Sequence, residues 1–257
     1  MIRCHFIFDN IKKNKKIKKF FLKKYNNYPL NLSNTIIVVG GDGFMLHSLK
    51  KYQKYNKAFY GINRGTFGFL MNKFRAKNVI KSISKAKQFY ISPLQIKAEV
   101  KNGKIFKAIA INEVSLLRQS RQTASLRVLN GKKILIKKLI CDGVLVSTPA
   151  GSTAYNLSVG GPILSLNSKK LAITPISPFR PRRWRGKIVV SPSIIKIKNL
   201  NIHKRSVSVV ADNVEIRNIK NVTIRMNNNI RFKLLYDRDN SLAKKIRLEQ
   251  NISKRLY

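Results

Sequence analysis

The stretch "TIIVVGGDGFML" at residues 35–46 indicates the fold of this chain more clearly than any other. Residues 35–39 form a short continuous apolar run, which is typical of a strand buried on both faces of a sheet. The run leads into the turn "GGDG" at residues 40–43, and we expect a helix to begin near Phe44. Strand, glycine-rich turn and helix in this order favour a parallel α/β sheet.

The segments around this stretch repeat the same alternation. "CHFIF" at residues 4–8 and "AFYGI" at residues 58–62 are predicted strands, and the basic segment at residues 11–25 is a predicted surface helix. Strands that alternate with helices predict an N-terminal α/β domain with a parallel sheet over residues 1–92.

The remainder of the chain has a different sequence pattern. Residues 93–235 contain many short runs of β-branched residues and the turn sequence Asn-Gly at 102–103 and 130–131, which predicts a β-rich C-terminal domain. In residues 236–257, Ser241 is a potential helix cap, and Leu242, Ile246 and Leu248 lie near helical spacing. We expect this segment to form a helix that packs back on the first domain.

The "GGDG" turn has the composition of a phosphate site. Gly40, Gly41 and Gly43 let a ligand approach the backbone closely, and the N-terminus of the following helix attracts phosphate. Asp42 fits three roles, namely a general base acting on a hydroxyl, a metal ligand, or the cap of an ordinary tight turn. The dinucleotide motif G-x-G-x-x-G is excluded because the last position holds Leu46.

Three further segments place polar groups where a ligand could bind. "GINRGTFGFLMN" at residues 61–72 is a second glycine-rich turn, which forms either the other wall of a cleft or a packed connection. Asn112 and Glu113 lie inside an apolar strand predicted at residues 110–117, where they need a ligand or a structural partner. Hydroxyls and free N–H groups are concentrated around Tyr155 in residues 141–163, "CDGVLVSTPAGSTAYNLSVGGPI". This combination suits a nucleotide.

The composition narrows the class of protein. The formal charge of +43 indicates either a solvated basic surface or a patch for a polyanion, and the spread of Lys and Arg along all 257 residues favours the surface. Cys4 and Cys141 form no CxxC pair, and three scattered histidines make a metal cluster improbable. Without a run of about 20 apolar residues, a cytoplasmic protein is expected.

The "GGDG" turn, the "NEV" at 112–114 and the run "DGVLVSTPAGSTAYNLSVGGPI" occur in the order and spacing typical of NAD kinases. The long run is the most specific of these motifs, since "GGDG" is shared with lipid and sugar kinases. The chain resembles the bacterial type of this family over nearly its whole length. That resemblance implies transfer of the terminal phosphate of ATP, or of polyphosphate, to the 2′-hydroxyl of the adenosine ribose of NAD.

The resemblance also implies roles for individual residues. Asp42 matches the proton acceptor and Gly43 a backbone contact to NAD, while Asn112 and Glu113 match the pair that holds the ribose and adenine side. Asp142 matches the acid at the nicotinamide end. The dinucleotide pocket would be lined by Ala150, Thr153, Ala154, Tyr155, Asn156, Leu157 and Ser158.

Further implications concern cofactors and partners. Mg²⁺ or another divalent cation would accompany ATP, and His47 would approach the nicotinamide or the phosphates, or else lie on the surface. Family members form homodimers or homotetramers, and residues 174–179 are the candidate contribution to a neighbour's NAD pocket. The chain departs from the family pattern at Phe179, where His is common, and at "ADN" (residues 211–213), where an Asp-Gly pair is common.

Two rival functions are open to test. A lipid or sugar kinase would share "GGDG" but would need an apolar channel, which the polar segment at residues 150–158 does not favour. A nucleic-acid-binding protein would explain the charge and would lose affinity steeply with salt, but it leaves the four motif segments unexplained.

Overall fold

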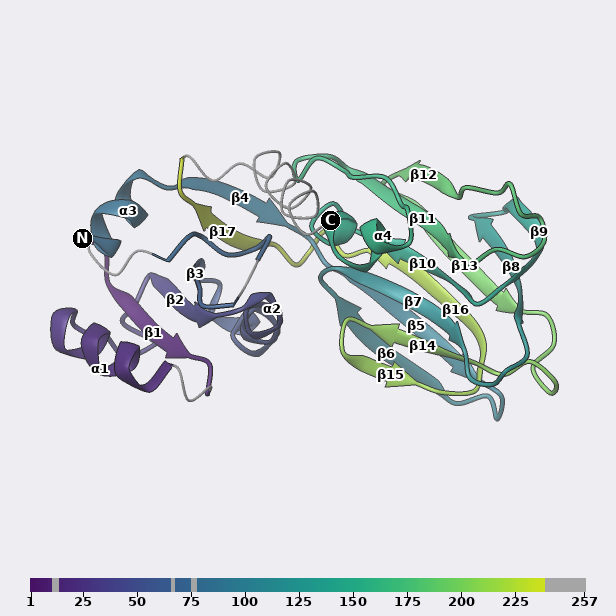
Figure 1. Cartoon of the computed structure of the whole chain (residues 1–257), viewed down its shortest axis with the longest axis horizontal. Coiled ribbons are helices and arrows are strands. Elements are labelled where there is room, and N and C mark those ends of the chain that lie inside the picture. The colour runs from purple at the N-terminus through teal and green to yellow at the C-terminus, as the bar shows by residue number, and fades with distance from the viewer. Residues whose placement is uncertain (11–13, 66–67, 75–77, 239–257) are drawn as a thin grey trace, which may run out of the picture. The chain divides into compact units, whose positions relative to one another are not determined.

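Strand β2 (Thr35–Gly40) is buried at all six positions and lies inside a five-stranded sheet. The computed structural model describes residues 1–10, 14–65, 68–74 and 78–238, and the chain divides into two units, shown in Figure 1. Unit 1 contains Met1–Tyr90 and the chain from Phe232, and unit 2 contains Ile91–Arg231. The predicted boundaries were 92/93 and 235/236.

The sheet of unit 1 has the order β1-β2-β3-β17-β4. Strands β1 and β2, β2 and β3, and β3 and β17 pair in parallel, which confirms the predicted parallel sheet. The remaining strands of this sheet are β1 (Cys4–Phe8), β3 (Ala58–Asn63), β4 (Lys87–Ile91) and β17 (Phe232–Tyr236).

The helices of unit 1 connect these strands. Phe21 on α1 is fully buried and packs against Phe6, with ring centroids 5.7 Å apart. Helix α2 begins at Asp42, two residues earlier than predicted, because Met45 N–H already donates to Gly41 C=O. The helical segments are α1 (Lys15–Lys24), α2 (Asp42–Lys51), the 3₁₀ turn η2 (Gln53–Tyr55) and α3 (Val79–Lys85).

Strand β17 corrects the sequence prediction. Its residues were expected in the β-rich domain, but Lys233 and Leu234 pair with Ala58 and Phe59 of β3. The Tyr60 hydroxyl donates to Asp237 just beyond the strand, at 2.7 Å. The helix predicted in residues 236–257 lies outside the described residues from residue 239 onward.

Unit 2 is built from two six-stranded antiparallel sheets, ordered β12-β11-β10-β7-β14-β15 and β6-β5-β16-β13-β8-β9. Apolar side chains from both sheets form one core, so the predicted β-rich domain is confirmed. The two Asn-Gly sequences form the hairpin turns, with φ of +85° at Gly103 and +59° at Gly131. The strands are β5 (Leu94–Val100), β6 (Ile105–Ala110), β7 (Glu113–Arg118), β8 (Ala124–Asn130), β9 (Lys133–Cys141), β10 (Gly143–Ser147), β11 (Lys170–Ile176), β12 (Lys187–Val190), β13 (Ile194–Asn199), β14 (Val207–Ala211), β15 (Val214–Ile216) and β16 (Ile219–Met226).

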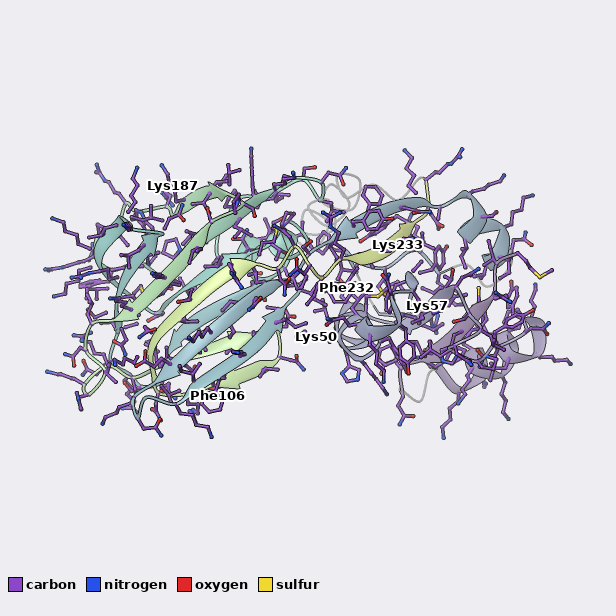
Figure 2. The ribbon with its side chains drawn as sticks, turned by 180° about the vertical axis from the view of Figure 1, so that it is seen from behind. Lys50, Lys57, Phe106, Lys187, Phe232 and Lys233 are labelled. Atoms are coloured by element: carbon purple, nitrogen blue, oxygen red, sulfur yellow. The ribbon has the colours of Figure 1, made fainter. Side chains whose placement is uncertain are left out.

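The basic side chains belong to many different elements of both units. Figure 2 labels Lys50 on α2, Lys57 before β3, Lys187 on β12 and Lys233 on β17. This spread agrees with a solvated basic surface better than with one polyanion patch. Among the residues described, no helix combines the length and the apolar character needed to cross a membrane.

Candidate functional site

Asp42 occupies the first position of α2, directly after the carboxyl end of β2. Its carboxylate accepts hydrogen bonds from Phe69 N–H at 2.7 Å and Leu70 N–H at 3.1 Å. The N-cap of α2 is Gly41, and no side chain caps this helix. Asp42 is therefore not the helix cap that one interpretation of the turn proposed, and its charge lies at the positive end of the helix dipole.

The second glycine-rich turn supplies those two N–H groups. It follows β3, which is the neighbour of β2, and Gly40 lies opposite Asn63 in the register. A Cβ on Gly68 would lie 2.9 Å from Asp42 Oδ1, so the close approach of turn and carboxylate requires glycine there. The structure thus brings the two predicted turns together. Phe67, in the part of this turn that a packed connection would bury, lies outside the described residues.

Tyr236 of β17 lies near Asp42 and was not singled out by the sequence. Its hydroxyl donates to Phe69 C=O at 3.3 Å, in the same turn that binds the Asp42 carboxylate. Burial raises the pKa of Tyr236 far above its usual value, and the negative charge of Asp42 raises it further. The hydroxyl therefore stays protonated and holds the turn from the side of β17.

His47 lies on a different side of α2. It is exposed and lines an open pocket of about 340 Å³ together with Phe6 and Phe8 of β1 and Lys18 of α1. Asp42, by contrast, faces the turn after β3. The approach of His47 to the nicotinamide or the phosphates stays a prediction.

Asn112 and Glu113 occupy a turn and a strand start in unit 2. Strand β6 ends at Ala110 and β7 begins at Glu113, so Asn112 is not inside a strand as predicted. Buried Asn112 Oδ1 and Glu113 Oε2 have no hydrogen-bond partner among the described residues. Buried polar atoms without partners are unfavourable, so this pair is suited to a ligand that donates hydrogen bonds.

The backbone around this pair is held from two sides. Thr148 donates through its N–H to Asn112 C=O at 2.9 Å and through its hydroxyl to Ile111 C=O at 2.7 Å. From the other side the Asp212 carboxylate accepts from Ile111 N–H at 2.7 Å, Asn112 N–H at 2.9 Å and Glu113 N–H at 3.4 Å. From the sequence, Asp212 stood out only within the segment "ADN" at residues 211–213, without an assigned role.

Burial raises the pKa of the Glu113 carboxyl from 4.5 to about 7, and the negative charge of Asp212 contributes in the same direction. The folded chain therefore binds this proton more tightly than the unfolded chain. The contribution of Glu113 to stability is complete below pH 4.5 and is lost as the pH rises towards 7.

This titration predicts a pH-dependent effect of Glu113→Gln. The variant should gain stability relative to the wild type as the pH rises from 5 to 8, by about 2 kcal/mol, because one pKa unit corresponds to about 1.36 kcal/mol. Urea denaturation of both proteins at a series of pH values measures the difference. Glu215→Gln, at a half-exposed position, is the control that should show no such trend, and a pH-independent difference for Glu113→Gln would contradict the raised pKa.

The small-residue segment after β10 uses most of its polar groups on its own backbone. Asn156 is fully buried and donates to Ser152 C=O and Pro162 C=O, while its Oδ1 accepts from the Thr174 hydroxyl at 2.7 Å. The Ser152 hydroxyl donates to Pro149 C=O at 2.8 Å. Many of the hydroxyl groups on which the predicted nucleotide site was based thus bind the protein's own backbone.

Some groups of this segment remain available for a ligand. Thr153 Oγ1 is buried without a partner among the described residues, and Tyr155 is 37% exposed. The segment folds as the 3₁₀ turn η3 (Gly151–Thr153) and the short helix α4 (Tyr155–Ser158). Of the other predicted lining residues, Ala150 is buried, Ala154 and Leu157 are half-buried, and Ser158 is exposed.

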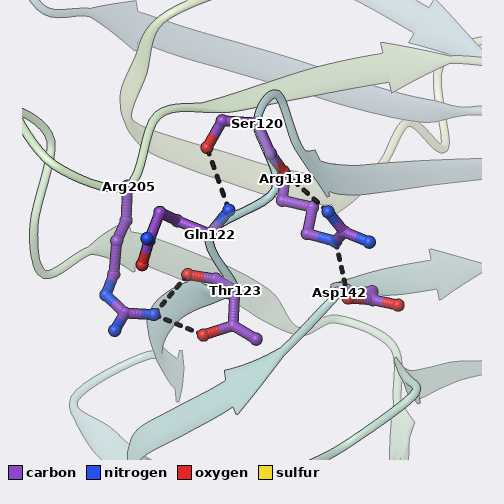
Figure 3. A network of polar contacts seen from close by, with 6 residues as sticks. All are labelled: Arg118, Ser120, Gln122, Thr123, Asp142 and Arg205. Atoms are coloured by element: carbon purple, nitrogen blue, oxygen red, sulfur yellow. Dashed lines mark hydrogen bonds and ion pairs between the residues drawn. The ribbon is translucent and has the colours of Figure 1, made fainter.

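Asp142 connects β9 to β10 and forms an ion pair that the sequence did not reveal. Figure 3 shows Arg118 at the end of β7, whose Nε lies 2.6 Å from Asp142 Oδ1 and whose Nη1 donates to Ser120 C=O at 2.7 Å. In the same view Arg205 binds the carbonyl and the hydroxyl of Thr123. Arg118 therefore fixes the orientation of the Asp142 carboxylate.

The described residues contain no group of three or more His, Cys, Asp and Glu side chains that could hold a metal ion. Both Asp42 oxygens already accept backbone N–H groups.

Comparisons with known proteins show which proteins this chain is similar to. The family model described as the ATP-NAD kinase C-terminal domain matches residues 111–234. The NAD kinase of Zymomonas mobilis is 48% identical over 232 residues, which cover 89% of each chain. The NAD kinase of Brucella suis is 42% identical over 249 residues, which cover 97% of each chain.

Two solved structures share the fold. Yeast NADH kinase complexed with NADH superposes with a TM-score of 0.81 at 20% identity, over 96% of this chain and 86% of that one. An NAD kinase from Archaeoglobus fulgidus in complex with ATP gives a TM-score of 0.73 at 22% identity, over 96% of this chain and 99% of that one. Taken with the sequence identities to bacterial NAD kinases over most of its length, these findings establish that the chain belongs to the NAD kinase family.

Proposed function

We propose that this member of the NAD kinase family transfers the terminal phosphate of ATP to the 2′-hydroxyl of the adenosine ribose of NAD, which gives NADP. The observation that carries the proposal is a pair of buried oxygens, Asn112 Oδ1 and Glu113 Oε2, that have no hydrogen-bond partner within the described part of the chain. A ribose carries neighbouring hydroxyl donors, and two adjacent acceptors are the complement that such a sugar needs.

Asp42 is the proposed proton acceptor. As the oxygen of the ribose hydroxyl bonds to the terminal phosphorus, the bond from that phosphorus to ADP breaks and the hydroxyl proton passes to the Asp42 carboxylate. The carboxylate accepts hydrogen bonds from two backbone N–H groups, those of Phe69 and Leu70. The two N–H groups fix the carboxylate, so little reorganisation accompanies the reaction.

The glycine turn is the proposed binding site for the donor's phosphates. The N-terminus of α2 is suited to the phosphates of ATP, with Gly40, Gly41 and Gly43 allowing close approach. Mg²⁺ bound to ATP would offset charge on the phosphates. Polyphosphate offers the same chain of phosphates and is an alternative donor.

The remaining site residues have proposed roles at the other end of NAD. Asp142, oriented by Arg118, is suited to accept hydrogen bonds from the nicotinamide carboxamide. Thr153 and Tyr155 offer a hydroxyl and an exposed ring. Asn156 acts indirectly, because its side chain holds the segment together.

We expect a cytoplasmic homodimer or homotetramer. In the segment proposed to reach a neighbouring subunit, residues 174–176 are buried inside β11, whereas Ser177 and Phe179 are exposed. Any contribution to a neighbour's pocket would therefore come from residues 177–179.

An assay with four substrate combinations tests the function. NAD or NADH is offered as the acceptor and ATP-Mg²⁺ or polyphosphate as the donor, and NADP or NADPH is measured. We expect NADP from NAD and ATP, with loss of product when EDTA removes Mg²⁺. A parallel reaction offers diacylglycerol as the acceptor, and phosphate transferred to this lipid and not to either dinucleotide would reject the proposal.

A further inference from the structure

Asp212 lies in the turn between β14 and β15, with a left-handed backbone at φ +53°. Few residues other than glycine adopt this conformation, and Asp is one of those that tolerate it. The turn directs the Asp212 carboxylate at the chain between β6 and β7.

Three consecutive backbone N–H groups converge on this carboxylate, from Ile111, Asn112 and Glu113. Successive N–H groups that point to one place form an anion-binding concavity, and here the anion is a side chain of the same protein. The connection is reciprocal, since Asp212 N–H donates to Glu113 C=O at 3.2 Å. Hydrogen bonds to a charged acceptor are about twice as strong as those between neutral groups.

The consequence concerns the side chains of Asn112 and Glu113. With Thr148 on one side and Asp212 on the other, the backbone of this pair cannot rotate without loss of several hydrogen bonds. We propose that Asp212 is a positioning residue for the NAD-binding pair, because its carboxylate fixes the backbone from which Asn112 Oδ1 and Glu113 Oε2 project. This inference rests on the proposed function, in which that pair holds the ribose.

Asp212 also acts through its charge. Its field adds to burial in raising the pKa of Glu113. The neighbouring strand β10 places Ser147 opposite Glu113, followed by Thr148, and neither is charged. Because the ionised carboxylate is the better acceptor for a ribose hydroxyl, NAD affinity should rise with pH through about 7.

The test compares Asp212→Asn with the control Glu215→Gln. The control also removes one negative charge, but from strand β15, at a residue that does not bind the backbone of Asn112 and Glu113. Calorimetric titration of the full-length protein with NAD, repeated from pH 5.5 to 8.5, gives the affinity and its pH midpoint. Asp212→Asn should weaken NAD binding by about tenfold, because an amide –NH₂ now faces one of the backbone N–H groups. Its midpoint should move to lower pH, whereas Glu215→Gln should change neither quantity.

Further variants separate positioning from loss of folding. In a Glu113→Gln background, Asp212→Asn should no longer shift any pH midpoint, and the two effects on affinity should not add. Asp212→Glu keeps the charge but moves the carboxylate by one methylene, so it should keep the wild-type midpoint while binding NAD less tightly. This variant also decides the matter if Asp212→Asn does not fold.

The inference would be overturned if Asp212→Asn kept the wild-type NAD affinity and pH midpoint, or if Asp212→Glu kept the wild-type NAD affinity. Failure of the underlying proposal has a different signature. If the wild type does not phosphorylate NAD, or if Glu113→Gln binds NAD like the wild type, then the assignment of the pair is wrong whatever Asp212 does.

Discussion

Asp42→Asn should lower kcat by about 10²- to 10⁴-fold, the range that general base catalysis contributes, while NAD affinity changes only a few-fold. An amide cannot take the proton that leaves the ribose hydroxyl. It keeps the size of the side chain and one acceptor oxygen for Phe69 N–H or Leu70 N–H. Steady-state kinetics with ATP-Mg²⁺ and NAD, combined with NAD titration, separates the loss of turnover from any loss of binding.

The control for this variant must disturb the same turn and leave the Asp42 carboxylate itself in place. Tyr236→Phe does so, because it removes only the hydroxyl that donates to Phe69 C=O. Its kcat should stay within about tenfold of the wild type, which corresponds to the loss of one neutral hydrogen bond. If Asp42→Asn turns over almost normally, Asp42 is not the base. If Tyr236→Phe loses as much activity, displacement of the turn explains both results.

Gly151→Ala should be the most destabilising substitution in the small-residue segment. A Cβ at this position would lie 2.1 Å from the carbonyl oxygen of Asn112 and 2.3 Å from its carbonyl carbon. These are backbone atoms of the proposed NAD-binding pair, held by Thr148 and Asp212, and they cannot move aside cheaply. We expect the free energy of unfolding to fall by about 3 kcal/mol, at the upper end for overpacking, and NAD affinity to fall with it.

Gly43→Ala is the matched comparison for stability. Gly43 lies within α2, and an added Cβ there would have no atom within 4 Å. Exchange of an open helical glycine for alanine should stabilise the protein by up to about 1 kcal/mol. Thermal unfolding of both variants measures the contrast, and equal melting temperatures would show that the turn around Gly151 yields more easily than its packing indicates.

The sequence predicted well those elements whose formation depends only on residues close together in the chain. The continuous apolar run of β2 and the glycine turn after it define strand and turn without distant information, and the Asn-Gly pairs define two hairpins. The start of α2 was misplaced because Asp42 and Gly43 are poor helix formers, and the bond from Met45 N–H to Gly41 C=O overrides that preference.

Features that depend on distant pairing could not be predicted. The residues of β17 have the mainly apolar composition of an ordinary buried strand, and only the partner, β3, decides the sheet to which they belong. The turn at Asn112 has no glycine or proline to mark it, and it is formed by hydrogen bonds from Thr148 and Asp212. For the same reason the sequence did not distinguish hydroxyls that bind the backbone, such as Ser152, from Thr153 Oγ1, which remains unpartnered among the described residues.

The position of β17 has a consequence for synthesis on the ribosome. The strand lies between β3 and β4 in its sheet, yet it is made about 140 residues after β4. The first sheet therefore stays open while unit 2, a continuous segment, can pair all its strands as it emerges. Domains usually mature in the order of translation, but in this chain the later segment can complete its fold first, and the nascent N-terminal segment must wait with an unfilled gap beside β3.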